Sequence, residues 1–336
     1  MIPYNWLEEA AERITPHIRK TPLTYDPHND LYLKWENHQV TGSFKARGAL
    51  NKVLALEEWE RQRGLVAASA GNHGQGVALA GRLVGAPVII FAAEHAVPSK
   101  LDAMRSLGAE VRLVAGGYGE AEQAGIAYAR ASEATWISPY NDGQVIAGQG
   151  TLGLEILKEL SDLPRATWVV PVGGGGLIAG IGVAVKTSPT AAAAAGRPRL
   201  VGVQSEASSF FHAIYHAGSQ AGVTELPSLA DGLAGPVEDH SLTIPLVSHY
   251  VDALVLVSEA DIAHAIAYTW QRYTERIEGS AAVALAAVLT GRVGERPAVV
   301  VLSGGNIQPE VHAEIVEKAE QASVSRRSSE SSAPGK

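Results

Sequence analysis

Residues 41–49 read Thr41-Gly42-Ser43-Phe44-Lys45-Ala46-Arg47-Gly48-Ala49, and a segment rich in alanine and leucine follows with helical spacing. Lys45 is therefore predicted on the first turn of a helix. The helix dipole disfavours a cation at this end, and the same field lowers the pKa of an amine. A neutral amine attacks an aldehyde to form an imine, so Lys45 is a candidate for covalent catalysis. A solvated lysine beside a loop is the alternative.

The composition limits the classes of function. The chain has 336 residues, a formal net charge of −8 and no cysteine, and it lacks a basic run interleaved with aromatic residues. Nucleic acid is therefore not an expected partner, and disulfides and thiolate metal sites are excluded. The N-terminus carries Glu8 and Glu9 where a signal peptide is apolar, and no apolar run reaches the roughly 18 residues of a membrane span. We expect a cytoplasmic protein without a membrane partner.

Short apolar segments alternate with helical segments along the chain. Strands are predicted at 31–36, 65–69, 88–91, 111–114, 168–172, 200–204, 251–257 and 298–302. Helices are predicted at 6–20, 73–84, 99–107, 119–133, 149–160, 259–273, 280–290 and 307–321. The alternation predicts an α/β fold in which mostly parallel sheets are covered by helices. Residues 191–195 are expected to form a surface connection or a frayed helix end.

Three further loops directly follow predicted strands, where open parallel sheets place their ligands. The first reads Ser69-Ala70-Gly71-Asn72-His73-Gly74. Its backbone N–H groups and the Asn72 amide could bind an anion such as a carboxylate. An ordinary helix N-cap is the alternative.

The second loop is a run of four glycines at Gly173, Gly174, Gly175 and Gly176. Residues without side chains let a phosphate approach the backbone N–H groups, and the N-terminus of the next helix adds its dipole. No GxxxxGK[ST] pattern is present, so a P-loop is rejected. Residues 174–179 do fit the dinucleotide pattern GxGxxA, with Glu206 at the end of the next strand, so a nicotinamide-dependent oxidoreductase stays open.

The third loop reads Ser303-Gly304-Gly305-Asn306. A serine at the end of a strand can donate a hydrogen bond to a heteroaromatic nitrogen, although it can also be a helix N-cap. Together the four motifs supply an imine-forming lysine, an anion loop, a phosphate loop and a partner for a ring nitrogen. Pyridoxal 5'-phosphate needs each of these, whereas a nicotinamide explains only the second loop.

In this order the four motifs resemble the fold-type II pyridoxal-phosphate enzymes, and within them the serine/threonine dehydratase and serine racemase group. The resemblance covers residues 5–318 and implies the two-lobed fold of the tryptophan synthase β type. It implies that Lys45 forms the internal aldimine, that Phe44 packs against the ring and that Ser303 faces the pyridine nitrogen. The implied contacts also include Asn72 with the ring 3-hydroxyl, Gly173, Gly174, Gly175 and Gly176 with the phosphate, and Ser69, Ala70, Gly71, Asn72 and His73 with the substrate carboxylate.

The same resemblance implies a domain division and a reaction. Residues 1–57 and 142–320 would form a large cofactor-binding lobe and residues 58–141 a small substrate-binding lobe, while residues 321–336 are expected to be disordered. The implied reaction is β-elimination, which converts L-threonine, L-serine or a related β-hydroxy amino acid to a 2-oxo acid and ammonia. The alternatives within the family are a serine racemase or a β-replacement enzyme; outside it, a catalytically silent cofactor-binding protein remains. A homodimer or higher homo-oligomer is expected.

Two positions depart from the family pattern. Position 70 is alanine, where serine racemases carry a second serine as the base for the opposite face of the α-carbon. Position 212 is histidine, where family members with a divalent-cation site have an aspartate six residues after the glutamate that aligns with Glu206. Losing a hard oxygen ligand puts Mg²⁺ or Ca²⁺ in doubt. His212 and His216 lie one helical turn apart without an evident third ligand for zinc, so no metal is expected.

Overall fold

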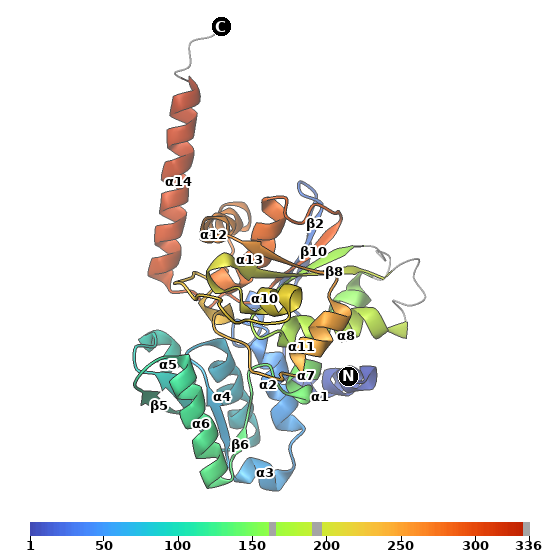
Figure 1. Ribbon diagram of the computed structural model, residues 1–336, viewed down its shortest axis with the longest axis vertical. Coiled ribbons are helices and arrows are strands. Elements are labelled where there is room, and N and C mark those ends of the chain that lie inside the picture. Colours follow the sequence, from blue (N-terminus) through green and yellow to red (C-terminus); the bar gives the residue numbers. More distant parts are fainter. Residues whose placement is uncertain (161–165, 190–196, 332–336) are drawn as a thin grey trace.

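A computed structural model describes residues 1–160, 166–189 and 197–331, with side chains as far as residue 322. The segment 191–195, predicted as a surface connection, lies outside the described residues. Two sheets organise the fold (Figure 1). The larger sheet has the strand order β1-β2-β10-β7-β8-β9, and the smaller sheet has the order β5-β4-β3-β6. Only the pair β1 and β2 is antiparallel among the described strands.

The strands of the larger sheet are β1 (Leu23–Asp26), β2 (Leu31–Trp35), β7 (Thr167–Pro171), β8 (Arg199–Ser205), β9 (Ala253–Val257) and β10 (Ala298–Leu302). Those of the smaller sheet are β3 (Leu65–Ala68), β4 (Val88–Ala93), β5 (Glu110–Val114) and β6 (Thr135–Trp136). The helices are α1 (Tyr4–Ile14), α2 (Lys45–Leu54), α3 (Glu58–Gln62), α4 (Asn72–Val84), α5 (Pro98–Ser106), α6 (Tyr118–Ser132), α7 (Gly143–Glu159), α8 (Gly176–Thr187), α10 (Phe210–Ala217), α11 (Thr243–Tyr250), α12 (Glu259–Tyr273), α13 (Gly279–Leu289) and α14 (Pro309–Ser331). Short 3-10 turns are η1 (Thr15–His17), η2 (Glu36–His38), η3 (Glu206–Ser208) and η4 (Asp231–Leu233).

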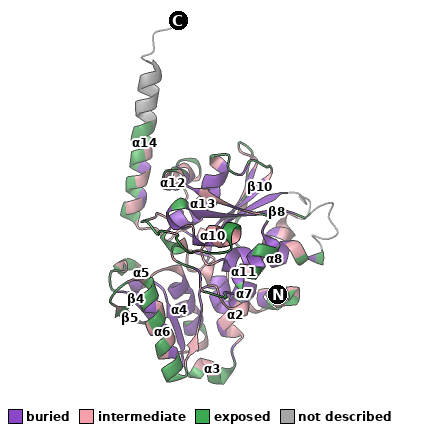
Figure 2. Ribbon diagram, viewed as in Figure 1, coloured by how far each residue is buried: buried purple, intermediate pink, exposed green. Residues whose placement is uncertain are grey.

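The larger sheet is buried on both faces because its central strands are apolar at almost every position. Alternate residues of β7 point to opposite faces, so Trp168 and Val170 pack with α8 while Val169 packs with α13. Helices α8 and α13 consist of small and aliphatic residues and are themselves buried almost throughout (Figure 2). The predicted α/β fold with mostly parallel sheets covered by helices is therefore confirmed.

The smaller sheet has the same layered construction. Leu65, Ala67 and Ile90 face the core shared with α2 and α4, whereas Val66 and Phe91 face α6. Its fourth strand, β6, was not predicted, because two residues are too few for a periodic pattern. No helix in the described part of the chain is both long enough and apolar enough to cross a membrane.

Helix α14 differs from its prediction. The sequence predicted that the helix ends at residue 321 and that residues 321–336 are disordered, whereas α14 continues to Ser331 and projects away from the body of the molecule (Figure 1). The turns of α14 up to Gln321 contain glutamate, lysine, alanine and glutamine, which are good helix formers. Lys318 also pairs with Glu314 one turn away. The prediction gave too much weight to the serines that follow. Residues 332–336 lie outside the described residues.

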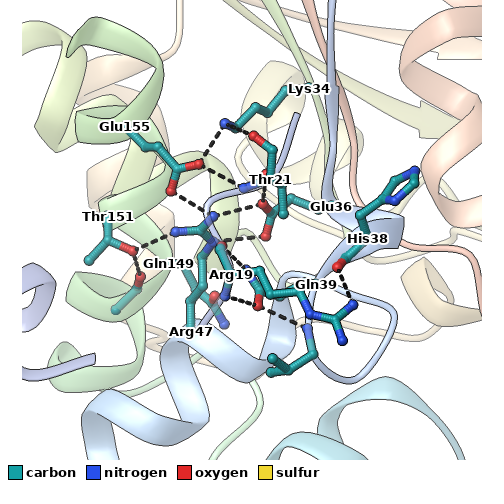
Figure 3. Close-up of polar contacts among 12 residues, drawn as sticks. Arg19, Thr21, Lys34, Glu36, His38, Gln39, Arg47, Gln149, Thr151 and Glu155 are labelled. Atoms are coloured by element: carbon teal, nitrogen blue, oxygen red, sulfur yellow. Dashed lines mark hydrogen bonds and ion pairs between the residues drawn. The ribbon is translucent and has the colours of Figure 1, made fainter. Parts of the chain in front are cut away.

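A buried cluster of charges fixes the position of α2. Arg47, two residues after Lys45, is fully buried and donates two hydrogen bonds of 2.8 Å to the two carboxylate oxygens of Glu36 in η2 (Figure 3). It also donates to Glu155 of α7 at 2.9 Å, and buried Lys34 of β2 donates to the same carboxylate at 2.6 Å. Burial alone would raise the pKa of Glu36, but the charge and hydrogen bonds of Arg47 outweigh it and lower that pKa.

We expect Arg47→Met to lower the free energy of unfolding by about 3–5 kcal/mol, because it leaves the Glu36 carboxylate buried without its partner. Urea unfolding monitored by circular dichroism measures this loss. Arg63→Met is the matched control, since Arg63 pairs with Glu133 in an exposed ion pair that is worth at most about 1 kcal/mol. Adding Glu36→Leu to Arg47→Met should recover much of the stability. Equal losses for Arg47→Met and Arg63→Met would contradict a structural role of this cluster.

Candidate active site

The lysine motif and the Ser303 loop are joined by backbone contacts. The N–H of Phe44 donates to the carbonyl of Ser303 at 3.0 Å, and Ser43 forms an isolated antiparallel bridge with Gly304. Gly42 has a φ of +72°, and a Cβ atom there would lie 2.6 Å from Oδ1 of Asn306. Glycine is required at this position for both reasons. The start of α2 is thus tied to the carboxyl end of β10.

Lys45 is the first residue of α2, as the sequence predicted. Its Nζ donates to the carbonyl of Pro139 at 2.9 Å and lies 5.3 Å from the centroid of the Phe44 ring. Burial lowers the pKa of Lys45 to about 8, against the opposing charge of Glu278. The protonated amine still predominates near physiological pH, but the neutral fraction is much larger than for an exposed lysine, and the main cause is burial.

The loop after β3 carries the candidate carboxylate contacts. Ser69 is buried, and its Oγ accepts the N–H of Gly71 at 3.0 Å. A Cβ atom at Gly71 would meet nothing within 4 Å, so this part of the loop borders open space. Nε2 of His73 contacts the carbonyl of Ile137 at 2.9 Å and must donate, since a carbonyl only accepts. Burial and the charge of Lys45 lower the pKa of His73 to about 3, so the ring is neutral.

The four glycines connect β7 with α8, as predicted. A Cβ atom at Gly174 would lie 2.4 Å from the ring of Tyr140, and one at Gly175, where φ is +85°, would lie 2.6 Å from Phe211. Glycine is therefore needed here for close packing against these rings, as well as for the approach of a phosphate to the backbone N–H groups. Oγ1 of Thr243 donates to the carbonyl of Gly174 at 2.7 Å and fixes the loop. Because Pro139, the partner of Lys45, precedes Tyr140, the glycine loop and the amine share one site.

The sequence did not identify Tyr140, Asn306 or Glu278 as site residues. Glu278 is 5% exposed, precedes α13 and accepts a hydrogen bond of 2.7 Å from Nδ2 of Asn72. Burial, together with the charge of Asp231, raises the pKa of Glu278 to about 7. A carboxylate before an apolar helix is a visible signal. Its contact with Asn72, 206 positions away in the chain, is not visible in the sequence.

A cavity of about 180 Å³ lies beside Glu278, between α5 and the larger sheet's loops. Lys100 of α5 forms an ion pair with Asp231 of η4 at 2.8 Å at its edge. This ion pair joins α5, which packs beside the smaller sheet, to η4, which packs beside the larger sheet. Of the four loops, only the Ser303 loop borders this cavity, through Asn306.

Glu206, His212 and His216, the residues considered for a metal site, lie on other elements than the four loops. Glu206 lies 3.5 Å from Arg292, and Nε2 of His216 contacts the carbonyl of Leu254 at 3.0 Å. The rings of His212 and His216 are tilted by 48° to each other, with centroids 4.3 Å apart. Within the described ranges, no group of three or more histidine, aspartate or glutamate side chains is arranged to hold a metal ion.

Comparison with known proteins gives the family of this chain. The family model described as pyridoxal-phosphate dependent enzyme matches residues 10–304. The chain belongs to this family. It is 41% identical over 325 residues to an L-threonine ammonia-lyase of Thermotoga maritima, a match that covers 95% of this chain and 79% of the relative.

Solved structures agree with this assignment. The processed form of threonine deaminase isoform 2 from Solanum lycopersicum is 29% identical, with a TM-score of 0.83 over 94% of this chain and 92% of that one. Serine racemase of Dictyostelium discoideum is 30% identical, with a TM-score of 0.81 over 91% and 99% of the two chains. The predicted fold-type II class and the pyridoxal-phosphate dependence are thereby confirmed. The nicotinamide alternative is thereby replaced.

Proposed function

We propose that the protein is a pyridoxal-phosphate-dependent ammonia-lyase that eliminates the β-hydroxyl of L-threonine, with L-serine and related β-hydroxy amino acids as further substrates. The observation that carries this proposal is the buried amine of Lys45, with its lowered pKa, beside the glycine loop. The likeness to threonine ammonia-lyases supports threonine as the first substrate.

The residues present fit the cofactor. The amine of Lys45, with its lowered pKa, suits the aldehyde. The helix N-terminus at the run of four glycines suits the phosphate. The loop that borders open space at Gly71 suits the substrate carboxylate. Pyridoxal phosphate, when bound, supplies the aldehyde and a ring that spreads negative charge from the substrate α-carbon.

Each side chain has a role in this proposal. Lys45 would hold the aldehyde of the cofactor and would take up the α-proton of the substrate. The N–H groups of Gly173, Gly174, Gly175 and Gly176 bind the phosphate, Phe44 packs against the ring and Asn72 binds its 3-oxygen. The loop Ser69, Ala70, Gly71, Asn72 and His73 binds the substrate carboxylate. Ser303 faces the ring nitrogen; because a neutral serine does not hold that nitrogen protonated, elimination is favoured over transamination.

The domain division follows the same proposal. Residues 1–57 and 142–320 form the large cofactor-binding lobe and residues 58–141 the small substrate-binding lobe, a division supported by the separate sheets that these segments build. We further propose a homodimer or higher homo-oligomer in the cytoplasm. Size-exclusion chromatography with light scattering tests this oligomeric state.

The experiment that tests the function combines absorbance with product release. Purified protein loaded with pyridoxal phosphate is expected to absorb at about 410–420 nm, as lysine-bound cofactor does. L-threonine should then yield equal amounts of ammonia and 2-oxo acid, and L-serine and a phenylserine form the comparison panel. Coloured protein that releases no 2-oxo acid from any of these substrates would reject the lyase assignment. A colourless protein would reject cofactor binding itself.

A further inference from the structure

A chain of three hydrogen bonds fixes the orientation of the Asn72 amide. Nδ2 of Asn306 lies 2.8 Å from the carbonyl oxygen of Thr41 and 2.6 Å from Oδ1 of Asn72. Nδ2 of Asn72 lies 2.7 Å from Oε1 of Glu278. The chain thus begins at a backbone carbonyl beside the lysine motif and ends at a buried carboxylate. Both asparagines and Glu278 belong to the loops that surround Lys45.

The direction of this chain follows from which groups can donate. A backbone carbonyl only accepts, so the atom that Asn306 presents to Thr41 must be its nitrogen. The same nitrogen has one more hydrogen, and it is directed at Asn72, which must therefore present its oxygen. The nitrogen of Asn72 then faces Oε1 of Glu278, and this oxygen must accept because an amide nitrogen only donates. Reversing either amide would place two acceptors, or two donors, against each other.

The two ends of the chain are held by the backbone. The N–H of Glu278 donates to the carbonyl of Gly304 at 3.1 Å, and the N–H of Gly305 donates to the carbonyl of Gly42 at 2.9 Å. A Cβ atom at Gly304 would lie 2.5 Å from Oε1 of Glu278, which shows how closely the carboxylate packs on this loop. The backbone at Glu278 and at Gly305, which precedes Asn306, is therefore held by the same segments that carry the lysine motif and the Ser303 loop.

We propose that Asn306 and Glu278 are positioning residues that make Asn72 a hydrogen-bond donor toward the oxygen on the cofactor ring. One N–H of Asn72 donates to Glu278, which leaves its second N–H for a ligand, while Oδ1 is held toward Asn306. A donor favours the ionised form of an oxygen ligand. Asn72 thereby stabilises the negative ring oxygen and, through it, the protonated form of the imine nitrogen. This inference rests on the proposed cofactor chemistry.

The test uses the visible absorbance of the cofactor-loaded protein at one fixed pH, before any substrate is added. The ratio of the band at about 410–420 nm to the band at about 330 nm reports the two protonation forms of the bound cofactor. We expect Asn306→Ser and Glu278→Ala each to lower this ratio at least about threefold, because Asn72 is then free to turn its oxygen toward the ring. Glu278→Gln should keep the wild-type ratio, since its amide oxygen can still accept from Asn72.

Asn37→Ala is the matched control. Asn37 lies against the other side of the same loop, where a Cβ atom at Gly305 would approach its side chain to 2.9 Å, but it bonds to Glu275 and Arg276 rather than to Asn72. This variant should keep the wild-type ratio. Circular dichroism checks that every variant is folded, and Asn72→Asp, which can only accept, supplies an independent case in which the ratio should fall.

The outcomes separate this inference from the proposed reaction. If the wild-type protein absorbs at about 410–420 nm but releases no ammonia, the proposed reaction is wrong. The spectra of the variants still decide the orientation of Asn72 in that case. Unchanged ratios in folded Asn306→Ser, Glu278→Ala and Asn72→Asp overturn the inference alone. Colourless wild-type protein overturns both.

Discussion

Lys45→Ala is expected to reduce ammonia release from L-threonine at least about 10³-fold, because base catalysis alone is commonly worth 10²–10⁴ and this variant also loses the covalent attachment of the cofactor. The amine is held in place by the carbonyl of Pro139 and by the first turn of α2. Lys100, which lines the neighbouring cavity, is paired with Asp231. Steady-state release of ammonia and 2-oxo acid measures the effect.

Lys52→Ala is the matched control for this prediction. Lys52 lies in the last turn of the same helix and forms an ion pair of 2.8 Å with Asp142, away from the glycine loop. Its removal should change turnover by less than about threefold, in keeping with the small energy of an ion pair at the protein surface. Urea unfolding should show that Lys45→Ala is folded, since burial already disfavours the charged amine. Ammonia release by Lys45→Ala at the wild-type rate would contradict the assignment of the whole site.

The sequence predicted the elements that carry the site better than those that surround it. Strand β10 was predicted with the bounds Ala298–Leu302 that the structure shows, because a buried parallel strand is continuously apolar. Helices α10 and α11 were not predicted. Helix α10 is rich in aromatic residues and histidine, which are weak helix formers, and α11 contains Pro245, which is tolerated near a helix start but breaks the usual pattern.

The candidate site residues were found from local motifs, because parallel strands bring the loops at their carboxyl ends to one edge. Residues that act through contacts between distant segments were not found. Glu278 can hold the Asn72 amide because the fold brings the start of α13 next to Asn72. Arg47 can pair with Glu155 because α7 packs beside it. A lysine in a strand is usually expected to be exposed, but Lys34 is buried. The carboxylate that compensates its charge belongs to Glu155, more than a hundred positions away in the chain. Such pairings depend on tertiary packing and leave no periodic signal.

The choice between elimination and racemisation depends on a second acid or base opposite Lys45. Racemisation removes a proton from one face of the α-carbon and delivers another to the opposite face, so a second proton-transferring group must stand across the cofactor plane. Position 70, where the serine racemases that this chain resembles have a serine, offers only a methyl group. The nearby polar groups already have hydrogen-bond partners within the protein. Ser69 is buried and its hydroxyl accepts the N–H of Gly71, while neutral His73 donates to Ile137.

We therefore expect elimination from L-serine to exceed formation of D-serine at least about 100-fold, the lower range of what one acid or base contributes. Chiral chromatography of the amino acid, run beside an assay for pyruvate, measures both products. Ala70→Ser should raise the share of D-serine at least about tenfold, because it restores a hydroxyl at the end of β3. Ala134→Ser, at another half-buried position beside the smaller sheet, is the control and should leave the share unchanged. D-serine formed as fast as pyruvate by the wild-type protein would favour the racemase alternative, and it would require an acid on the far face that is not a side chain of the 69–73 loop.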